Sequence, residues 1–414
     1  MIIETLRSER QQDRARIVAT VQWEDSNRAT EDIYFETQAE FAEDLTCNPH
    51  AFLTGCVVPA LHHGEKRIFI DEEICPELRD GLMSGMELLR HWYYEPMRGL
   101  PRIEAKRRSR SLTSDRPARA GAFFSGGVDA WTTLRRNRLD FHPEHSAYIK
   151  DTLLVFGLFR DEPGNFKDVL NRTIKAARMM GTIPIPIWTN LVSLGQGWDF
   201  WGDEFEGAAF AAIAHAFANR LSVVSLASSY HIPLVHPHGS HPMLDPSYSS
   251  SDLRIKHDGI CLSRLMKVKL LAEWDIALKE LRVCNQTRFI TPERLNCGQC
   301  EKCVRTMLAL LAVGALGRAP VFPQQDVSAN LVESAVYMDR TTSLFYGELL
   351  APLNALGRRD LVLAIERKLS GYRRLERRQR VKDHIKKFDA EYLRGALIGT
   401  LKSIYPKPMS TSDI

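Results

Sequence analysis

The 414-residue chain lacks two features, long apolar runs and a large net charge. Its longest apolar stretches, Met307 to Leu316 and Ala208 to Ala218, are too short to span a bilayer. Acidic and arginine residues follow Met1 too early for a secretory signal. The formal charge of +4 is too small to indicate a nucleic-acid partner by itself. We therefore expect a cytoplasmic protein without membrane contact.

The chain has only eight cysteines, and four of them form one motif that is described below. Of the eight cysteines, Cys47, Cys56, Cys75 and Cys261 follow no ligand spacing, and we interpret them as ordinary thiols. This usage is typical of a reducing compartment. With 44% apolar and 26% charged residues, the composition is that of a globular protein long enough for two or three domains.

The most informative segment is a glycine turn between a strand pattern and a helix pattern. The apolar run Ala122 to Phe124 leads into Ser-Gly-Gly-Val-Asp at residues 125–129, and a helix-forming stretch follows. Backbone N–H groups at such a turn bind oxyanions, aided by the positive end of the helix dipole. Asp129 is suited to hold Mg²⁺ against a polyphosphate. The segment predicts a phosphate-binding loop; taken alone, an ordinary strand-to-helix turn is the alternative.

A second motif consists of four cysteines. Cys297, Cys300 and Cys303 form two overlapping C-x2-C steps, and Cys284 lies upstream. Four thiolates complete the tetrahedral shell that Zn²⁺ prefers in structural sites, and they leave no open position for catalysis. The spacing predicts a structural zinc site, with an iron–sulfur cluster as the alternative.

Together the two motifs resemble those of the PP-loop ATP pyrophosphatases, in particular the branch of 7-cyano-7-deazaguanine synthase. The shared pattern is a Ser-Gly-Gly-x-Asp loop, then an upstream Cys, and then Cys-Gly-x-Cys-x-x-Cys-x-Arg at residues 297–305. It covers roughly residues 120–316. The resemblance implies an α/β fold with a Rossmann-like (HUP-type) parallel sheet and a zinc knuckle. It also implies that ATP adenylates a carboxylate or carbonyl oxygen, that pyrophosphate leaves, and that a nitrogen or sulfur nucleophile displaces AMP.

The resemblance also assigns roles to residues. ATP with Mg²⁺ would be the co-substrate, with adenine against the backbone at Phe156 and Gly157 and with Lys267 reaching the phosphates. Asp129 and Lys267 are then the catalytic candidates. The expected cofactor-binding residues are Ser125, Gly126, Gly127, Val128, Asp129, Phe156 and Gly157.

The acceptor region is expected between residues 228 and 269. Its candidate residues for substrate contact are Ser228, Ser229, His238, His241 and Arg264. Two departures from the family pattern lie in the motifs: Ala130 stands where the family usually has serine, and a Tyr-Pro-Asp stretch linked to deazaguanine recognition is missing. The acceptor is therefore open between a small heterocycle, a modified base and a peptide.

The organisation along the chain is read from periodicity. We expect an α+β accessory domain at 1–100, a basic linker at 101–119, the PP-loop domain at 120–316 and a helical basic region at 317–414. Within the PP-loop domain, apolar runs alternate with helical spacing, as in a parallel sheet. These runs are Thr152–Phe156, Pro184–Trp188 and Leu221–Leu226, and the helical segments are Phe166–Met180 and Phe205–Asn219.

The C-terminal region adds a basic segment. Residues 367–387 carry ten lysines and arginines against two acidic residues, which indicates either an RNA contact or a solvated helix. We expect an AMP-forming, ligase-like enzyme that joins a nitrogen to the acceptor. The alternatives are thiolation of tRNA or a purine by the same adenylation, and a noncatalytic nucleotide sensor or RNA-binding component. A partner protein is a further expectation, based on the size of the flanking regions.

Overall fold

The computed structural model describes residues 1–109, 118–156, 166–195, 197–284, 286, 291 and 294–392. The chain divides into two compact units, residues 1–326 and 327–414. Gly157, expected to contact adenine, lies outside the described residues. Among the described residues, no helix combines the length and the apolar character needed to cross a membrane.

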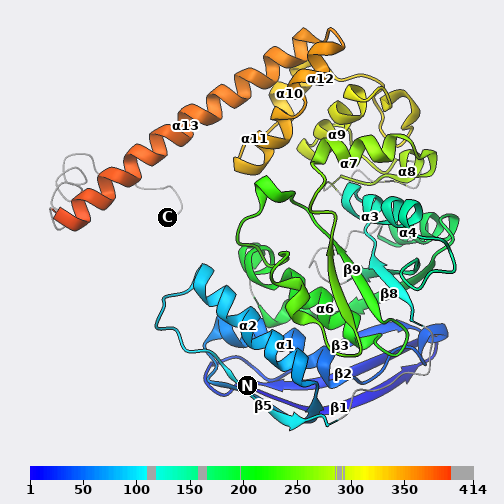
Figure 1. Ribbon diagram of the computed structural model, residues 1–414, viewed down its shortest axis with the longest axis vertical. Helices are drawn as coiled ribbons and strands as arrows, with labels where there is room; N and C mark the ends of the chain where they lie inside the picture. Colours follow the sequence, from blue (N-terminus) through cyan, green and yellow to red (C-terminus); the bar gives the residue numbers. More distant parts are fainter. Residues whose placement is uncertain are drawn as a thin grey trace, which may run out of the picture. The chain divides into compact units, whose positions relative to one another are not determined.

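Ten described strands of the first unit form one sheet (Figure 1). Its order is β10-β9-β6-β7-β8-β3-β2-β1-β4-β5. The pairs are parallel except around β2 and β3, so the expected α/β class with a mostly parallel sheet is confirmed. The strands are β1 (Ile2–Gln11), β2 (Arg14–Gln22), β3 (Glu31–Gln38), β4 (Arg67–Ile74), β5 (Arg102–Arg107), β6 (Ala120–Phe123), β7 (Ile149–Phe156), β8 (Ile183–Thr189), β9 (Val223–Ala227) and β10 (Arg254–Asp258).

Helices connect and cover these strands. In the first unit they are α1 (Pro49–His63), α2 (Pro76–Tyr93), α3 (Val128–Asp140), α4 (Phe166–Met179), α5 (Gly197–Asp199), the π-helical turn η3 (Phe200–Phe205), α6 (Glu206–Ala216), α7 (Arg264–Ala272), α8 (Asp275–Glu280) and α9 (Glu301–Ala312). Short 3-10 turns are η1 (Ala39–Phe41), η2 (Leu191–Leu194), η4 (Ile232–Leu234), η5 (Asp245–Tyr248) and η7 (Leu316–Arg318). Helix α1 packs on α6, whereas α3 packs on α7.

The parallel strands are doubly wound. From β6 the chain moves outward through β7 to β8, returns to β9 on the other side of β6, and ends at β10. The direction of winding therefore reverses between β6 and β9. In open α/β sheets, ligands bind at such a switch point, outside the carboxyl ends of the strands. The loops that follow β6 and β9 begin at Phe124 and Ser228 and border this position.

The N-terminal strands continue the same sheet. Strand β3 pairs antiparallel with β8, and the Thr37 hydroxyl donates a 2.7 Å hydrogen bond to the Pro186 carbonyl. Side chains of both halves share one hydrophobic core, for example Phe35 beside Ile187. Residues 102–107, placed in a linker by the sequence, form strand β5 beside β4. The accessory segment is thus built into the unit that carries the Ser-Gly-Gly turn.

The second unit is helical where it is described. It consists of α10 (Ala329–Ala335), α11 (Arg340–Gly347), α12 (Leu350–Ala355) and α13 (Arg359–Tyr392). Leu361, Ile365 and Leu369 bury one face of the first turns of α13. The basic segment 367–387 lies along the later turns of this helix, where most side chains are exposed.

Candidate nucleotide and metal site

The predicted phosphate loop follows strand β6 and starts helix α3. Gly126 adopts a φ of +77°, a left-handed conformation that glycine takes readily, and Gly127 caps the helix. The Gly127 N–H donates to the Ser125 hydroxyl at 3.4 Å. The Val128 side chain is buried, so only its backbone N–H can serve a ligand. The turn thus has the backbone geometry of an oxyanion site at a helix N-terminus.

Asp129 lies in the first turn of α3 and binds two cations from α7. The Lys267 ammonium donates to one carboxylate oxygen at 2.7 Å, and Arg264 donates to the other at 3.0 Å. Burial raises the pKa of the Asp129 carboxyl, but the charges of Arg264 and Lys267 outweigh burial and hold the pKa below its ordinary value. Three residues predicted from the sequence therefore meet in one charged cluster.

Lys267 has an unusual environment for a lysine. Its side chain is only 2% exposed, and the ammonium also donates to the Ser228 carbonyl at the end of β9. Burial lowers its pKa more than Asp129 raises it. Ser228 is buried with its hydroxyl bonded to the Tyr230 carbonyl, and Ser229 is exposed beside Arg264. Lys267 thus links the loops that follow β6 and β9.

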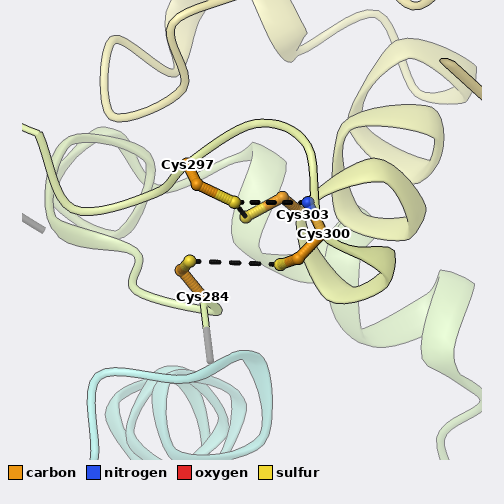
Figure 2. Close-up of side chains that lie close together, drawn as sticks. All are labelled: Cys284, Cys297, Cys300 and Cys303. Atoms are coloured by element: carbon orange, nitrogen blue, oxygen red, sulfur yellow. Dashed lines mark hydrogen bonds between the residues drawn. The ribbon is translucent and has the colours of Figure 1, made fainter. Parts of the chain in front are cut away.

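The four cysteines form a compact cluster (Figure 2). Their sulfur atoms all lie within 4.8 Å of one another, and Cys297 to Cys303 and Cys284 to Cys300 are separated by 3.8 and 3.9 Å. A tetrahedral ion with bonds of about 2.3 Å sets sulfur atoms about 3.8 Å apart. An iron–sulfur cluster places several irons between its cysteines and needs a wider frame. The group of four cysteines is therefore of a size to hold one metal ion.

The local backbone stabilises thiolates in this cluster. The N–H groups of Gln299 and Cys300 donate to the Cys297 sulfur at 3.4 and 3.2 Å, in a turn that Gly298 makes with a φ of +73°. Without a cation, the hydrogen bond to Cys300 raises the pKa of the Cys284 thiol to about 11. Four thiolates at these distances therefore require a positive ion between them.

Asn296 joins the two chain segments of the cysteine cluster, the one that ends at Cys284 and the one at residues 297–303. Its side-chain oxygen accepts from the N–H groups of Val283 and Cys284 at 2.9 and 3.2 Å, and its amide donates to the Leu281 carbonyl at 2.8 Å. Because Asn296 is fully buried and makes these bonds, the arm with Cys284 is fixed to the arm with the other three cysteines.

The knuckle also touches the phosphate loop. Arg282, two residues before Cys284, donates its N–H to the Gly126 carbonyl at 2.8 Å and its guanidinium to the Ser125 carbonyl at 3.1 Å. Lys302 lies between two metal-site cysteines. Desolvation and the charges of Arg305 and Arg264 lower the pKa of its ammonium. The cysteine cluster and the Ser-Gly-Gly turn are therefore connected through Arg282.

The π-helical turn η3 is held in place by the loop that contains His238. The Gly239 N–H donates to the Gly202 carbonyl, and the Gly239 carbonyl accepts from the Gly207 N–H, both at 2.8 Å. A Cβ on Gly239 would lie 2.7 to 2.9 Å from backbone atoms of residues 204–206, so only glycine permits this approach. The contact brings His238 Nδ1 to 3.7 Å from the Glu206 carboxylate.

The N-terminal half of the chain fixes this turn. Glu204 accepts from the Tyr94 hydroxyl and lies 3.0 Å from His62 Nδ1. Tyr94 directly follows α2, and His62 lies on α1. Such π-turns are frequent at functional sites. Helix α6, which begins here at Glu206, packs close to the start of the Ser-Gly-Gly turn, since the rings of Phe210 on α6 and Phe123 at the end of β6 lie 4.7 Å apart.

Not every predicted residue joins the site. His241 is 5% exposed, its ring packs against Trp92 at 4.8 Å, and its Nδ1 accepts from the Met243 N–H. Phe156 ends β7 and lies 5.6 Å from the Trp188 ring. We therefore assign His241 to the packing of the loop and keep His238 for the site.

Sequence reasoning missed Arg282, Lys302 and Glu206. Lys302 lies inside the cysteine motif, and Arg282 stands two residues before it, so basic residues adjoining the ligands were an available signal. Glu206 starts a helix at the end of an irregular turn, and no local pattern marks it.

Comparison with family models, with curated proteins and with solved structures gives no match. The function is therefore argued from the site itself.

Proposed function

We propose that this protein is an ATP pyrophosphatase of the PP-loop kind, with a HUP-type nucleotide site. The proposal rests on one observation above all. A Ser-Gly-Gly turn at the switch point of a doubly wound sheet is bordered by Lys267, Arg264 and Arg282. Backbone donors, a helix N-terminus and cations converge there, and this is the chemistry that a polyphosphate requires.

The proposed reaction adenylates an oxygen of the acceptor and releases pyrophosphate. The N–H groups of residues 126–128 would bind the phosphates, with Mg²⁺ bound together with ATP. Lys267 and Arg264 would offset the charge on the leaving pyrophosphate, and Asp129 holds both cations in place. A nitrogen nucleophile then displaces AMP from a small heterocycle, a modified base or a peptide.

We further propose Zn²⁺ as the ion of the knuckle. The four cysteines supply all positions of a tetrahedral site, and the sulfur spacings suit a single ion. Its role would be structural: it would hold Arg282, two residues before Cys284, against the loop and fix Lys302 between Cys300 and Cys303.

The experiment is to incubate zinc-loaded protein with Mg-ATP and a panel of deazapurine acids, purines, tRNA and peptides. Phosphorus NMR distinguishes the products. AMP and pyrophosphate with one acceptor would support the proposal and name the acceptor class. ADP and phosphate would contradict it, and binding without turnover would favour a nucleotide sensor.

Thiolation by the same adenylation is the second candidate. Cys261 is exposed in the loop after β10, at the carboxyl edge of the sheet and three residues before Arg264. A persulfide on this thiol has access to the rim of the site, whereas the four clustered cysteines are taken by the metal. Mass spectrometry of the product separates the candidates, and thiolation predicts that Cys261→Ser abolishes sulfur transfer.

The basic segment of α13 carries the proposal of an RNA contact. Its residues 373–387 are mostly exposed, and the described ion pairs of this stretch are few, such as Arg380 with Glu376. A fall of RNA affinity with rising salt, lost when Arg373, Arg374 and Arg377 are changed to alanine, tests this contact.

A further inference from the structure

We infer that Glu206 is the proton acceptor for the nucleophile, with His238 beside it on the acceptor side of the site. This inference rests on the proposed adenylation and adds a residue that no sequence motif marks. It follows from where the carboxylate lies, what surrounds it and what it does not contact.

The position of Glu206 is fixed from two directions. The residue begins α6 directly after the turn η3, and Gly239 presses against the backbone of the same turn. Glu204, two residues earlier, is held by His62 and Tyr94. A side chain that starts from so constrained a backbone has a defined direction, as a catalytic group requires.

The Glu206 carboxylate is left free to react. Its side chain is 28% exposed, and among the described residues no donor lies within hydrogen-bonding distance of it. His238 Nδ1 lies 3.7 Å from it, and that nitrogen already accepts from the Ser240 N–H at 3.2 Å. The neutral imidazole thus carries its proton on Nε2 and gives none to Glu206.

Four charged or titratable groups face this carboxylate. Asp245 comes from η5, Asp129 from α3, Lys302 from α9, and His238 from the loop. Desolvation and the two aspartates raise the pKa of Glu206 to about 7, against the opposing charge of Lys302. Burial and the neighbouring His236 lower the pKa of His238, so His238 stays neutral near pH 7. A base with a pKa near the working pH transfers protons efficiently.

Ammonia attacks the carbonyl carbon of the acyl adenylate, and a carbon–nitrogen bond forms. The nitrogen then carries an extra proton, which passes to the Glu206 carboxylate. The bond from carbon to the AMP oxygen breaks, and AMP leaves with the electron pair. Lys267 and Arg264 lie beside the loop to receive the negative charge of that leaving group.

The test compares two nucleophiles in Glu206→Gln. Zinc-loaded wild type and variant are given Mg-ATP, 7-carboxy-7-deazaguanine as the first acid probe, and either ammonium chloride or hydroxylamine. After its attack, hydroxylamine has a far more acidic nitrogen than ammonia, and water can take its proton. We expect the ammonia-dependent rate to fall by about 10²-fold or more. The hydroxylamine-dependent rate and the exchange of pyrophosphate into ATP should stay near the wild-type values.

Two further measurements separate catalysis from folding. At a constant concentration of free NH₃, the wild-type rate should rise with pH around a midpoint near 7 as Glu206 loses its proton, and this rise should be absent from Glu206→Gln. Asp199→Asn removes an exposed carboxylate from the neighbouring helix α5 and should leave both rates unchanged.

The outcomes distinguish the two proposals. Equal loss with both nucleophiles, or an unchanged ammonia rate in a variant that still exchanges pyrophosphate, overturns the role of Glu206 alone. If wild type releases no pyrophosphate with any acid of the panel, the proposed function fails and this inference fails with it.

Discussion

Replacing Asp129 with asparagine removes the charge that holds the two cations of the phosphate site. The carboxylate accepts from Lys267 at 2.7 Å and from Arg264 at 3.0 Å. Leaving a buried charge without its partner costs about 3–5 kcal/mol. Asp129 is 23% exposed and Lys267 only 2%, so solvent screens part of the loss and we expect about 2–3 kcal/mol less free energy of unfolding. Pyrophosphate release should be abolished.

Urea unfolding of zinc-loaded protein, with and without Mg-ATP, measures both effects. In wild type, ATP at about 100 times its Kd adds about 2.7 kcal/mol to the free energy of unfolding, and the variant should gain much less. Asp275→Asn is the matched control, since its partner Arg318 and its own side chain are largely exposed. A loss below about 1 kcal/mol together with normal pyrophosphate release would refute this account of the site.

Three other changes test separate parts of the structure. Cys300→Ser leaves three thiolates and should lower the metal content, as measured by plasma emission spectroscopy. It should also weaken Mg-ATP binding, because the segment that carries Arg282 is no longer held by the metal. Full metal content in this variant would contradict a four-cysteine metal site. Because its pKa is raised, the Glu206 carboxyl is protonated more readily in the folded state than in the unfolded state. As pH rises from about 4.5 to 7, the melting temperature of wild type should therefore fall relative to that of Glu206→Gln. Parallel curves of melting temperature against pH for the two proteins would contradict the raised pKa. Gly239→Ala forces a Cβ to within 2.7 Å of a backbone atom and should cost about 1–3 kcal/mol in urea unfolding, whereas wild-type stability would show that the loop can move away.

The sequence predicted elements whose pattern is local. Leu78, Leu82, Met86 and Leu89 stand at helical spacing in the sequence, and all four are buried on α2. Helix α1 escaped detection because it is buried nearly all round between its neighbours, so it has no polar face and no clear period. Strand β10 was missed for the opposite reason: at the edge of the sheet its sequence Arg-Ile-Lys-His-Asp reads as polar.

The candidate site likewise contains residues that a local sequence pattern marks and residues that no such pattern marks. The cysteine cluster was predictable because its cysteines have characteristic spacings, and in the structure they come together. Asp129 and Lys267 were named separately, Asp129 for Mg²⁺ and Lys267 through the resemblance for the phosphates. Their ion pair joins residues 138 apart and was not predicted. Glu206 lay beyond reach, because its position depends on a π-turn held by His62 and Tyr94 and on a loop that approaches through Gly239.

The joining of β3 to β8 has a consequence for synthesis on the ribosome. Thr37 emerges 149 residues before its partner Pro186. At 5–20 residues per second, the edge of β3 waits about 7–30 s for its neighbour. An unpaired edge can recruit other chains, and charged side chains discourage this. Strand β3 carries the acidic residues Glu31, Asp32 and Glu36. Their charges would discourage pairing with other chains before β8 has been synthesised.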